Sequence, residues 1–124
     1  MVEFQLIMSN IIKEKSFAFA VRIVNLSRFL CGEKSEFVLS KQLLRSGTAI
    51  EALVREAEQA ESKLDFAHKL AIALKEANET QYWILLLRET KYLTSSQSES
   101  LLTDTTELLK LLTSIVKTTR KNQQ

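Results

Sequence analysis

Residues that commonly carry out chemistry in proteins are few in this chain. It has one histidine, His68, and one cysteine, Cys31. His68 follows Asp65 by three positions, so on a helix the imidazole and the carboxylate would lie one turn apart. A di-iron bundle needs two Glu-x-x-His pairs and two further glutamates, so this single pair cannot build such a centre. The sequence also lacks a glycine-rich phosphate loop, a nucleophile elbow and metal-ligand spacing. We therefore expect no catalytic residue, no metal and no cofactor.

A cysteine and a pair of glutamates are the other candidates for reactive groups. Cys31 comes near the end of a predicted helix, where the helix dipole disfavours a thiolate, so we interpret it as a packing residue. Glu76 and Glu79 lie within one helical turn, but no other reactive group accompanies them. With lysines nearby, they fit a solvated or interhelical charged surface better than a carboxylate pair for catalysis. An enzyme is the weakest functional hypothesis.

The C-terminal part of the chain is basic. After Glu107 it has no acidic residue and four basic ones: Lys110, Lys117, Arg120 and Lys121. Two interpretations remain open, because such cations either stabilise the end of a helix through its dipole or bind the phosphates of a nucleic acid. The net charge of the whole chain is only +2, well below the strong excess expected of an obvious nucleic-acid-binding protein.

Composition predicts a single all-α domain. The chain is long enough for one core, and 45% apolar with 26% charged residues is typical of globular proteins. With no proline and two glycines, little interrupts regular helices. The longest apolar run, residues 82–87, is far shorter than the roughly 20 residues of a membrane span. No signal peptide is recognisable, so we expect a cytoplasmic protein that does not enter a membrane.

Apolar residues recur every three or four positions in four segments, which predicts four helices. Their expected bounds are about residues 10–31, 36–58, 63–92 and 97–120. Residues 1–9 show no clear period and are left as a frayed or docked lead-in. Gly32 is expected to end the first helix. Ser35, Ser62 and Ser96 are expected to cap the other three. Because the connections are short, we predict an antiparallel up-down-up-down four-helix bundle over residues 1–124.

The predicted third helix has more apolar surface than one bundle buries. Residues 82–87 are all apolar, and at about 100° per residue they point in every direction around a helix. Soluble monomers rarely expose so large a patch, which favours a homo-oligomer over the alternative of wide core faces. The candidates for the subunit interface are Phe17, Phe19, Tyr82, Trp83, Leu85 and Leu86.

Gly47 lies in the middle of the predicted second helix. A glycine at such a position destabilises a helix by roughly 1 kcal/mol relative to alanine. The neighbouring residues Ser46, Thr48 and Ala49 are also small. We therefore expect a neighbouring helix to approach closely at this point, which would compensate for the glycine.

Four segments of the chain resemble a known family. They are residues 15–20, 39–50, 63–70 and 75–83. The most specific part is a Gln-Leu-x-Arg-Ser motif, followed here by glycine, with the residues Gln42, Leu43, Arg45, Ser46 and Gly47. From about residue 10 to residue 121, the chain is similar to the four-helix-bundle proteins encoded in intervening sequences of large-subunit ribosomal RNA genes. That family has no established biochemical activity.

The resemblance implies a ring-shaped homopentamer. It also implies kinship with the accessory variability determinant of diversity-generating retroelements, a basic pentamer that binds a reverse transcriptase and nucleic acid. Two departures are visible. Where many relatives read Asn-Ile-Ala-Glu-Gly, this chain has Leu-Val-Arg-Glu-Ala at residues 53–57, which keeps only the acidic position. Its charge of +2 is also well below that of the retroelement protein.

If the motif carries over, Arg45 pairs with Glu76 or Glu79 of the third helix, within or between subunits. The sequence as a whole favours a non-catalytic, homo-oligomeric adaptor. Its expected partners are further copies of itself and RNA or a nucleic-acid-bound protein. The alternative is a protein-binding scaffold with no nucleic-acid role.

Overall fold

The computed structural model describes residues 2–123 and the side chains of residues 6–122, so Met1 of the predicted lead-in lies outside it. The described part contains four helices and no strand, which confirms the prediction of an all-α protein with four helices. They are α1 (Val2–Glu33), α2 (Leu39–Glu58), α3 (Lys63–Glu89) and α4 (Ser95–Gln123). None of these helices combines the length and hydropathy needed to cross a lipid bilayer.

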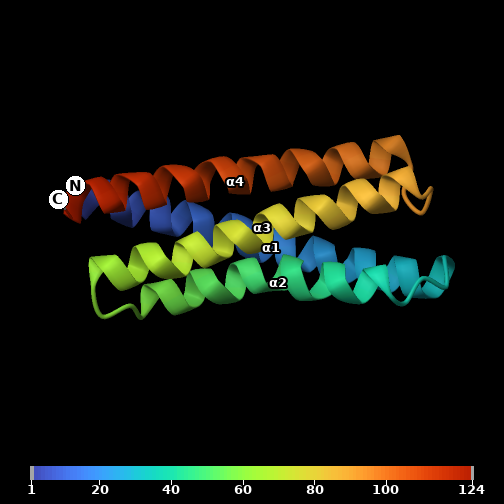
Figure 1. Cartoon of the computed structure of the whole chain (residues 1–124), viewed down its shortest axis with the longest axis horizontal. Helices are drawn as coiled ribbons and strands as arrows, with labels where there is room; N and C mark the ends of the chain where they lie inside the picture. Colours follow the sequence, from blue (N-terminus) through green and yellow to red (C-terminus); the bar gives the residue numbers. More distant parts are fainter. Residues whose placement is uncertain (1, 124) are drawn as a thin grey trace.

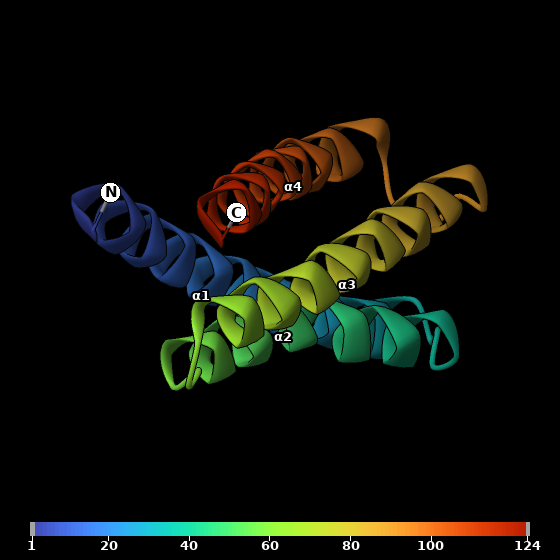
Figure 2. The same cartoon turned by 60° about the vertical axis from the view of Figure 1, so that its left-hand side comes forward.

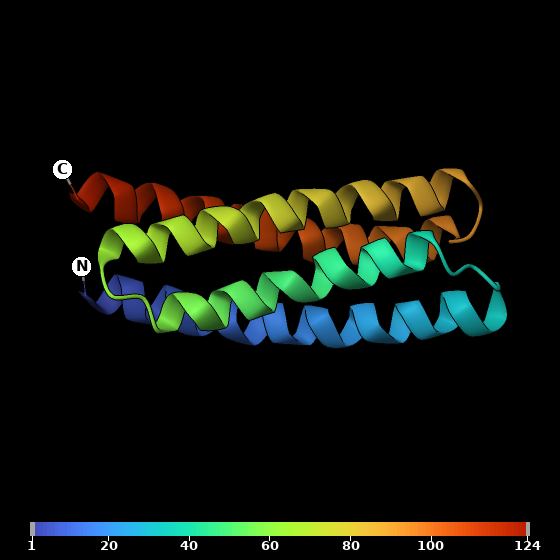
Figure 3. The same cartoon turned by 60° about the horizontal axis from the view of Figure 1, so that its bottom comes forward.

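Consecutive helices lie side by side, and the chain turns back at each of the three connections (Figure 1). Both termini therefore lie at the same end of an elongated molecule. α2 packs against α1 and α3, and α4 packs against α3. α1 and α4 also touch, although theirs is the smallest of the four contacts. At the end that holds the termini, α1 and α4 diverge (Figure 2 and Figure 3).

One apolar core runs along the bundle. Each helix contributes side chains at three- and four-residue spacing, as expected for helices that bury one face. The largest fully buried side chains are Ile12, Phe19, Ile23, Leu30, Leu43, Ile50, Leu70, Ile84, Leu87, Leu108, Leu112 and Ile115. Because complete burial of one such side chain contributes about 1.5–3 kcal/mol, this core is the main source of stability.

The first helix is longer at both ends than the sequence analysis expected. α1 begins at Val2, so the part of the lead-in that the structure describes is helical, and Gly32 lies inside the last turn instead of ending the helix. The chain leaves α1 through Ser35, which has a φ of 53°. The amide of Glu36 then donates to the carbonyl of Leu30 at 2.9 Å. A left-handed residue after a helix is usually glycine, but here a serine takes that conformation.

The expected cap of α2 was wrong, whereas that of α3 is confirmed. α2 begins at Leu39, and Ser35 does not cap it. Instead, the carboxylate of Glu36 accepts a hydrogen bond from the amide of Ser40 at 2.7 Å. At the start of α3, the hydroxyl of Ser62 accepts a hydrogen bond from the amide of Asp65 at 3.0 Å. A serine in this position satisfies one of the amides that the first turn leaves unpaired.

The start of α4 also differs from the prediction. The helix begins two residues earlier than expected, at Ser95, and Ser96 lies within it. Thr94 and Gln97 form the capping box: the Thr94 amide donates to the Gln97 side chain at 2.9 Å, and the Gln97 amide donates to the Thr94 hydroxyl at 3.1 Å. α3 ends at Glu89, before the expected residue 92. Residues 94–97 and residues 96–99 both match the capping-box pattern, so the pattern alone does not identify the one that caps the helix.

Candidate nucleic-acid interface

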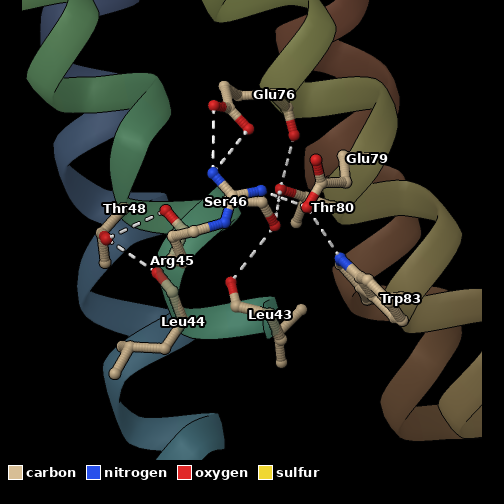
Figure 4. Close-up of polar contacts among 9 residues, drawn as sticks. All are labelled: Leu43, Leu44, Arg45, Ser46, Thr48, Glu76, Glu79, Thr80 and Trp83. Atoms are coloured by element: carbon tan, nitrogen blue, oxygen red, sulfur yellow. Dashed lines mark hydrogen bonds and ion pairs between the residues drawn. The ribbon is translucent and has the colours of Figure 1, made fainter. Parts of the chain in front are cut away.

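The Gln-Leu-x-Arg-Ser motif lies on α2 and forms contacts with α3 (Figure 4). The guanidinium of Arg45 forms ion pairs with Glu76, at 3.2 Å, and with Glu79. The same Glu79 carboxylate accepts a hydrogen bond from the indole Nε1 of Trp83 at 3.0 Å. The predicted pairing of Arg45 with α3 is confirmed, and it involves both glutamates of one subunit.

These contacts change the acidity of the groups involved. The indole of Trp83 lowers the pKa of Glu79 from its ordinary value, Arg45 lowers it further, and partial burial acts in the opposite direction. The two carboxylates, Glu76 first, raise the pKa of Arg45. The Arg45 side chain is 49% exposed, so solvent screens much of the attraction. We interpret this network as a contact that sets the register of α2 against α3 and not as a catalytic group.

Two small residues of the motif are buried between helices. Ser46 accepts a hydrogen bond from the hydroxyl of Thr80 at 2.9 Å, inside the α2–α3 contact. At Gly47, an added Cβ would lie 2.8 Å from the side chain of Ile23 on α1. The expected close approach of a helix at Gly47 is confirmed. The sequence analysis missed Thr80, although a threonine within the apolar stripe of α3 is the signal that would have indicated it.

The remaining two motif residues behave differently from each other. Leu43 is fully buried in the core. Gln42 is exposed, and its side chain forms no hydrogen bond with another described residue. Most of the motif therefore specifies how α2 packs against its neighbours, and it does not form a site for chemistry.

The predicted basic residues lie on the exposed side of α4, towards its C-terminal end. Lys117, Arg120 and Lys121 line an open groove between α4 and α3. Leu74 of α3 and the nearly buried Val116 supply apolar surface to this groove. The structure thus brings three of the four cations together, and it adds a residue from α3 that the sequence analysis did not identify.

Lys110 lies beside this groove. It shares a neighbouring depression on α4 with Lys117. None of the ion pairs between described side chains involves any of the four cations. One of those ion pairs, Arg55 with Glu51, lies within α2. The others cross the α1–α2, α1–α4 and α2–α3 contacts, and none of them crosses the α3–α4 contact. The C-terminal part of α4 therefore exposes four cations that form no ion pair with a described carboxylate.

The predicted interface residues divide into exposed, half-buried and buried ones. Phe17 on α1 and Tyr82 on α3 are 52% and 55% exposed. Three residues of α3 are half-buried: Trp83, Leu85 and Leu86. The prediction for Phe19 was wrong, because this side chain is only 2% exposed and belongs to the core of its own subunit. Phe17 and Phe19 are two positions apart, which corresponds to about 200° around a helix, so one side chain points outward and the other points inward.

The exposed apolar residues form patches on two helices that do not contact each other. On α1, Phe17 is joined one turn later by the exposed Val21, and we call these two residues the α1 patch. On α3, the exposed Tyr82 and the half-buried Leu86 form the α3 patch. α1 and α3 are diagonal in the bundle, so the two patches face different directions. The sequence analysis missed further exposed apolar side chains, namely Leu6, Ile7, Phe37, Val38 and Leu64.

Side chains with potential reactivity do not converge. His68 is exposed, and the Sγ of Cys31, which is half-buried, lies 3.5 Å from the hydroxyl of Ser40. The carboxylates of Glu76 and Glu79 are held by the ion pairs described above. Within residues 6–122, no three His, Cys, Asp or Glu side chains are grouped so that they could hold a metal ion.

Comparison with known proteins identifies the family of this chain. A family model described as 23S rRNA-intervening sequence protein matches residues 8–114. Among solved structures, a crystal structure of a protein of unknown function from the S23 ribosomal protein family of Bacteroides thetaiotaomicron is similar, with 61% sequence identity and a TM-score of 0.87. The similarity covers 89% of this chain and 98% of that one. None of the curated proteins matches the chain. On these findings, the chain belongs to the 23S rRNA-intervening sequence protein family.

Proposed function

We propose that this protein is a non-catalytic, homo-oligomeric adaptor, built from up-down-up-down four-helix bundles, that binds RNA through the outer surface of α4. The observation that carries the proposal is the cluster of four exposed cations that have no carboxylate partner among the described side chains: Lys110, Lys117, Arg120 and Lys121. Lysine and arginine contacts to phosphates supply most of the sequence-independent affinity for nucleic acids.

Self-association is the second part of the proposal. Because the α1 patch and the α3 patch lie on diagonal helices, a head-to-tail contact buries both: the α1 patch of one subunit packs on the α3 patch of the next. Such contacts form a closed ring when the rotation between subunits allows it, and the family resemblance favours a ring of five. A ring repeats the basic cluster once per subunit and so strengthens the positive field that an RNA meets.

The alternative function is a protein-binding scaffold with no nucleic-acid role. In that case the cations would only stabilise the C-terminal end of α4 through the helix dipole. Arg120 and Lys121 lie in the last turn and fit this explanation. Lys110 and Lys117 lie farther from the helix end, where the effect of the dipole has largely decayed. The position of these two lysines favours the RNA-binding proposal.

Fluorescence anisotropy with a labelled RNA fragment tests the proposal. We expect binding to weaken steeply between about 50 and 200 mM salt. Replacing Lys117, Arg120 and Lys121 with alanine should weaken binding on the order of tenfold or more and reduce the salt slope by about 3. The matched control replaces three exposed cations that lie outside α4 and form no ion pair with another described side chain: Lys41, Lys63 and Lys91.

The control variant removes the same net charge from the protein. It should therefore lose much less affinity than the α4 variant if the contact is local. Circular dichroism should show that both variants remain helical. Equal losses in the two variants, or no RNA binding by the wild-type protein at 50 mM salt, would refute RNA binding through α4.

A further inference from the structure

The outer face of α4 carries hydroxyl groups as well as cations. Between Thr103 and Lys121, its exposed side chains that are polar and not acidic are Thr103, Thr106, Lys110, Thr113, Ser114, Lys117, Arg120 and Lys121. At about 100° per residue, spacings of seven and four positions place Lys110, Lys117 and Lys121 in one line along the helix. At 1.5 Å per residue this line is about 16 Å long. It therefore extends over more than a single phosphate.

The carboxylates near this line do not interrupt it. Glu107 forms an ion pair with Lys15 of α1 at 2.6 Å, so its charge is directed towards α1 and compensated. Glu99 lies three turns before Lys110, near the start of the helix. Between Glu107 and the end of α4 the sequence has no acidic residue. Lysine, arginine, serine and threonine are the side chains that most often contact phosphates and sugars in protein–nucleic acid complexes.

The surface of α4 lacks a feature that proteins commonly use to bind single-stranded nucleic acids. Proteins that bind single strands commonly stack the unpaired bases on aromatic side chains. α4 has no aromatic residue in its sequence. The residues that line the three depressions along it are also all non-aromatic, including Leu74 from α3. A rigid helix without stacking residues instead suits a ligand whose phosphates are already held at fixed positions.

We infer that the ligand of this surface is double-stranded RNA, contacted through its phosphates and sugars and without base readout; this inference rests on the proposed function. The cations along α4 contact the phosphates of the duplex. Between them, the exposed hydroxyl of Ser114 contacts phosphate oxygens, and the hydroxyl of Thr113, which donates to the carbonyl of Leu109 at 2.7 Å, accepts from a 2′-hydroxyl. Recognition of double-stranded RNA by shape and by contacts to 2′-hydroxyls and phosphates is the usual mode for A-form helices.

The test compares three RNA probes in the same buffer: a blunt duplex of about 20 base pairs, and each of its two strands alone, chosen to be unstructured. We expect the duplex to bind on the order of tenfold more tightly than either strand, because its fixed phosphates match the rigid helix. A second duplex of unrelated sequence should bind with similar affinity. Replacing Lys110 and Lys117 with alanine should weaken duplex binding and reduce its salt slope by about 2, whereas replacing Lys41 and Lys63 should change it little.

The outcomes separate this inference from the proposed function. If either single strand binds as tightly as the duplex, the inference of a duplex ligand is wrong, although binding of RNA through α4 stands. If the two duplexes differ strongly in affinity, recognition without base readout is wrong. If none of the probes binds at low salt, both the inference and the proposed function are wrong.

Discussion

Ile23 of α1 lies directly against Gly47 of α2: a β-carbon added to the glycine would be 2.8 Å from both Cγ1 and Cγ2 of the isoleucine. Ile23 is fully buried, so neighbouring core side chains restrict its movement. The close contact of these two helices therefore depends on the missing side chain at Gly47. This packing explains why the middle of α2 contains a residue that is unfavourable in helices.

We predict that Gly47→Ala lowers the free energy of unfolding by about 1–3 kcal/mol, because overpacking a full core forces side chains or helices to shift. Alanine favours a helix over glycine by roughly 1 kcal/mol, which acts in the opposite direction. A net loss of stability therefore comes from the steric clash with Ile23. Urea denaturation followed by circular dichroism measures it. The matched control is Gly32→Ala, since Gly32 also lies in a helix and has no atom within 4 Å of an added Cβ. That control should raise stability, and equal gains at both glycines would contradict the importance of the Ile23 contact.

A second prediction concerns a buried hydroxyl in α4. Thr119 is fully buried, and its Oγ1 has no hydrogen-bond partner within the described part of the chain. Thr119→Val replaces the hydroxyl with a methyl group of similar size, so we expect the free energy of unfolding to rise by about 1 kcal/mol. Thr105→Val is the control, because the equally buried Thr105 donates to the carbonyl of Leu101 at 2.7 Å. Valine there should be neutral or destabilising; a larger gain at Thr105 than at Thr119 would contradict the explanation.

The sequence predicted the core best where apolar residues are sparse. In the fourth helix, five residues at three- and four-residue spacing are all buried, because most of the residues between them are polar: Leu101, Thr105, Leu108, Leu112 and Ile115. In the first helix, Phe17-Ala18-Phe19-Ala20-Val21 is apolar at every position. The period then cannot identify the inward face, which is why Phe19 was assigned to an interface.

Features that depend on tertiary contacts were harder to predict. The composition indicated the basic C-terminal segment, but not that Leu74, far away in the sequence, lies beside Lys117 and Arg120 in one groove. The pairing of Arg45 with the glutamates of α3 was predicted from the motif. The buried hydrogen bond between Ser46 and Thr80 requires the relative position of two helices, which no local pattern specifies.

The third prediction is a pH dependence at Glu79. The pKa of this carboxyl is lowered in the folded protein, so its contacts stabilise the fold above the pKa of the unfolded chain, about 4.3, and this stabilisation is lost as the pH falls through the folded-state pKa. Glu79→Gln should therefore lower stability at pH 7, by up to about 1 kcal/mol, and should matter less near pH 3.

Urea titrations of both proteins at several pH values, followed by tryptophan fluorescence, measure this difference. Glu14→Gln is the control, since Glu14 is exposed and has no ion pair within the described residues. An effect of Glu79→Gln that stays constant from pH 7 to pH 3 would show that its charge does not contribute.

The fourth prediction tests the head-to-tail assembly. Phe17→Glu places a charge in the α1 patch, and Tyr82→Glu places one in the α3 patch, so each variant alone should lose its oligomers because burying a charge in an apolar contact is strongly unfavourable. Light scattering coupled to gel filtration should then report masses near the 14.2 kDa of one subunit. Thr106→Glu, a change at an exposed residue of α4 that belongs to neither patch, should leave the assembly intact.

Mixing the two variants distinguishes a head-to-tail contact from a symmetric one. The Phe17→Glu subunit retains an intact α3 patch, and the Tyr82→Glu subunit retains an intact α1 patch, so one undamaged contact can form between them. A head-to-tail assembly therefore predicts a heterodimer in the mixture that neither variant forms alone, with no larger species, because the other two patches are blocked. In a symmetric contact between two α1 patches, Tyr82→Glu alone would stay dimeric. That result, or a wild-type mass of one subunit, would rule out the proposed contact.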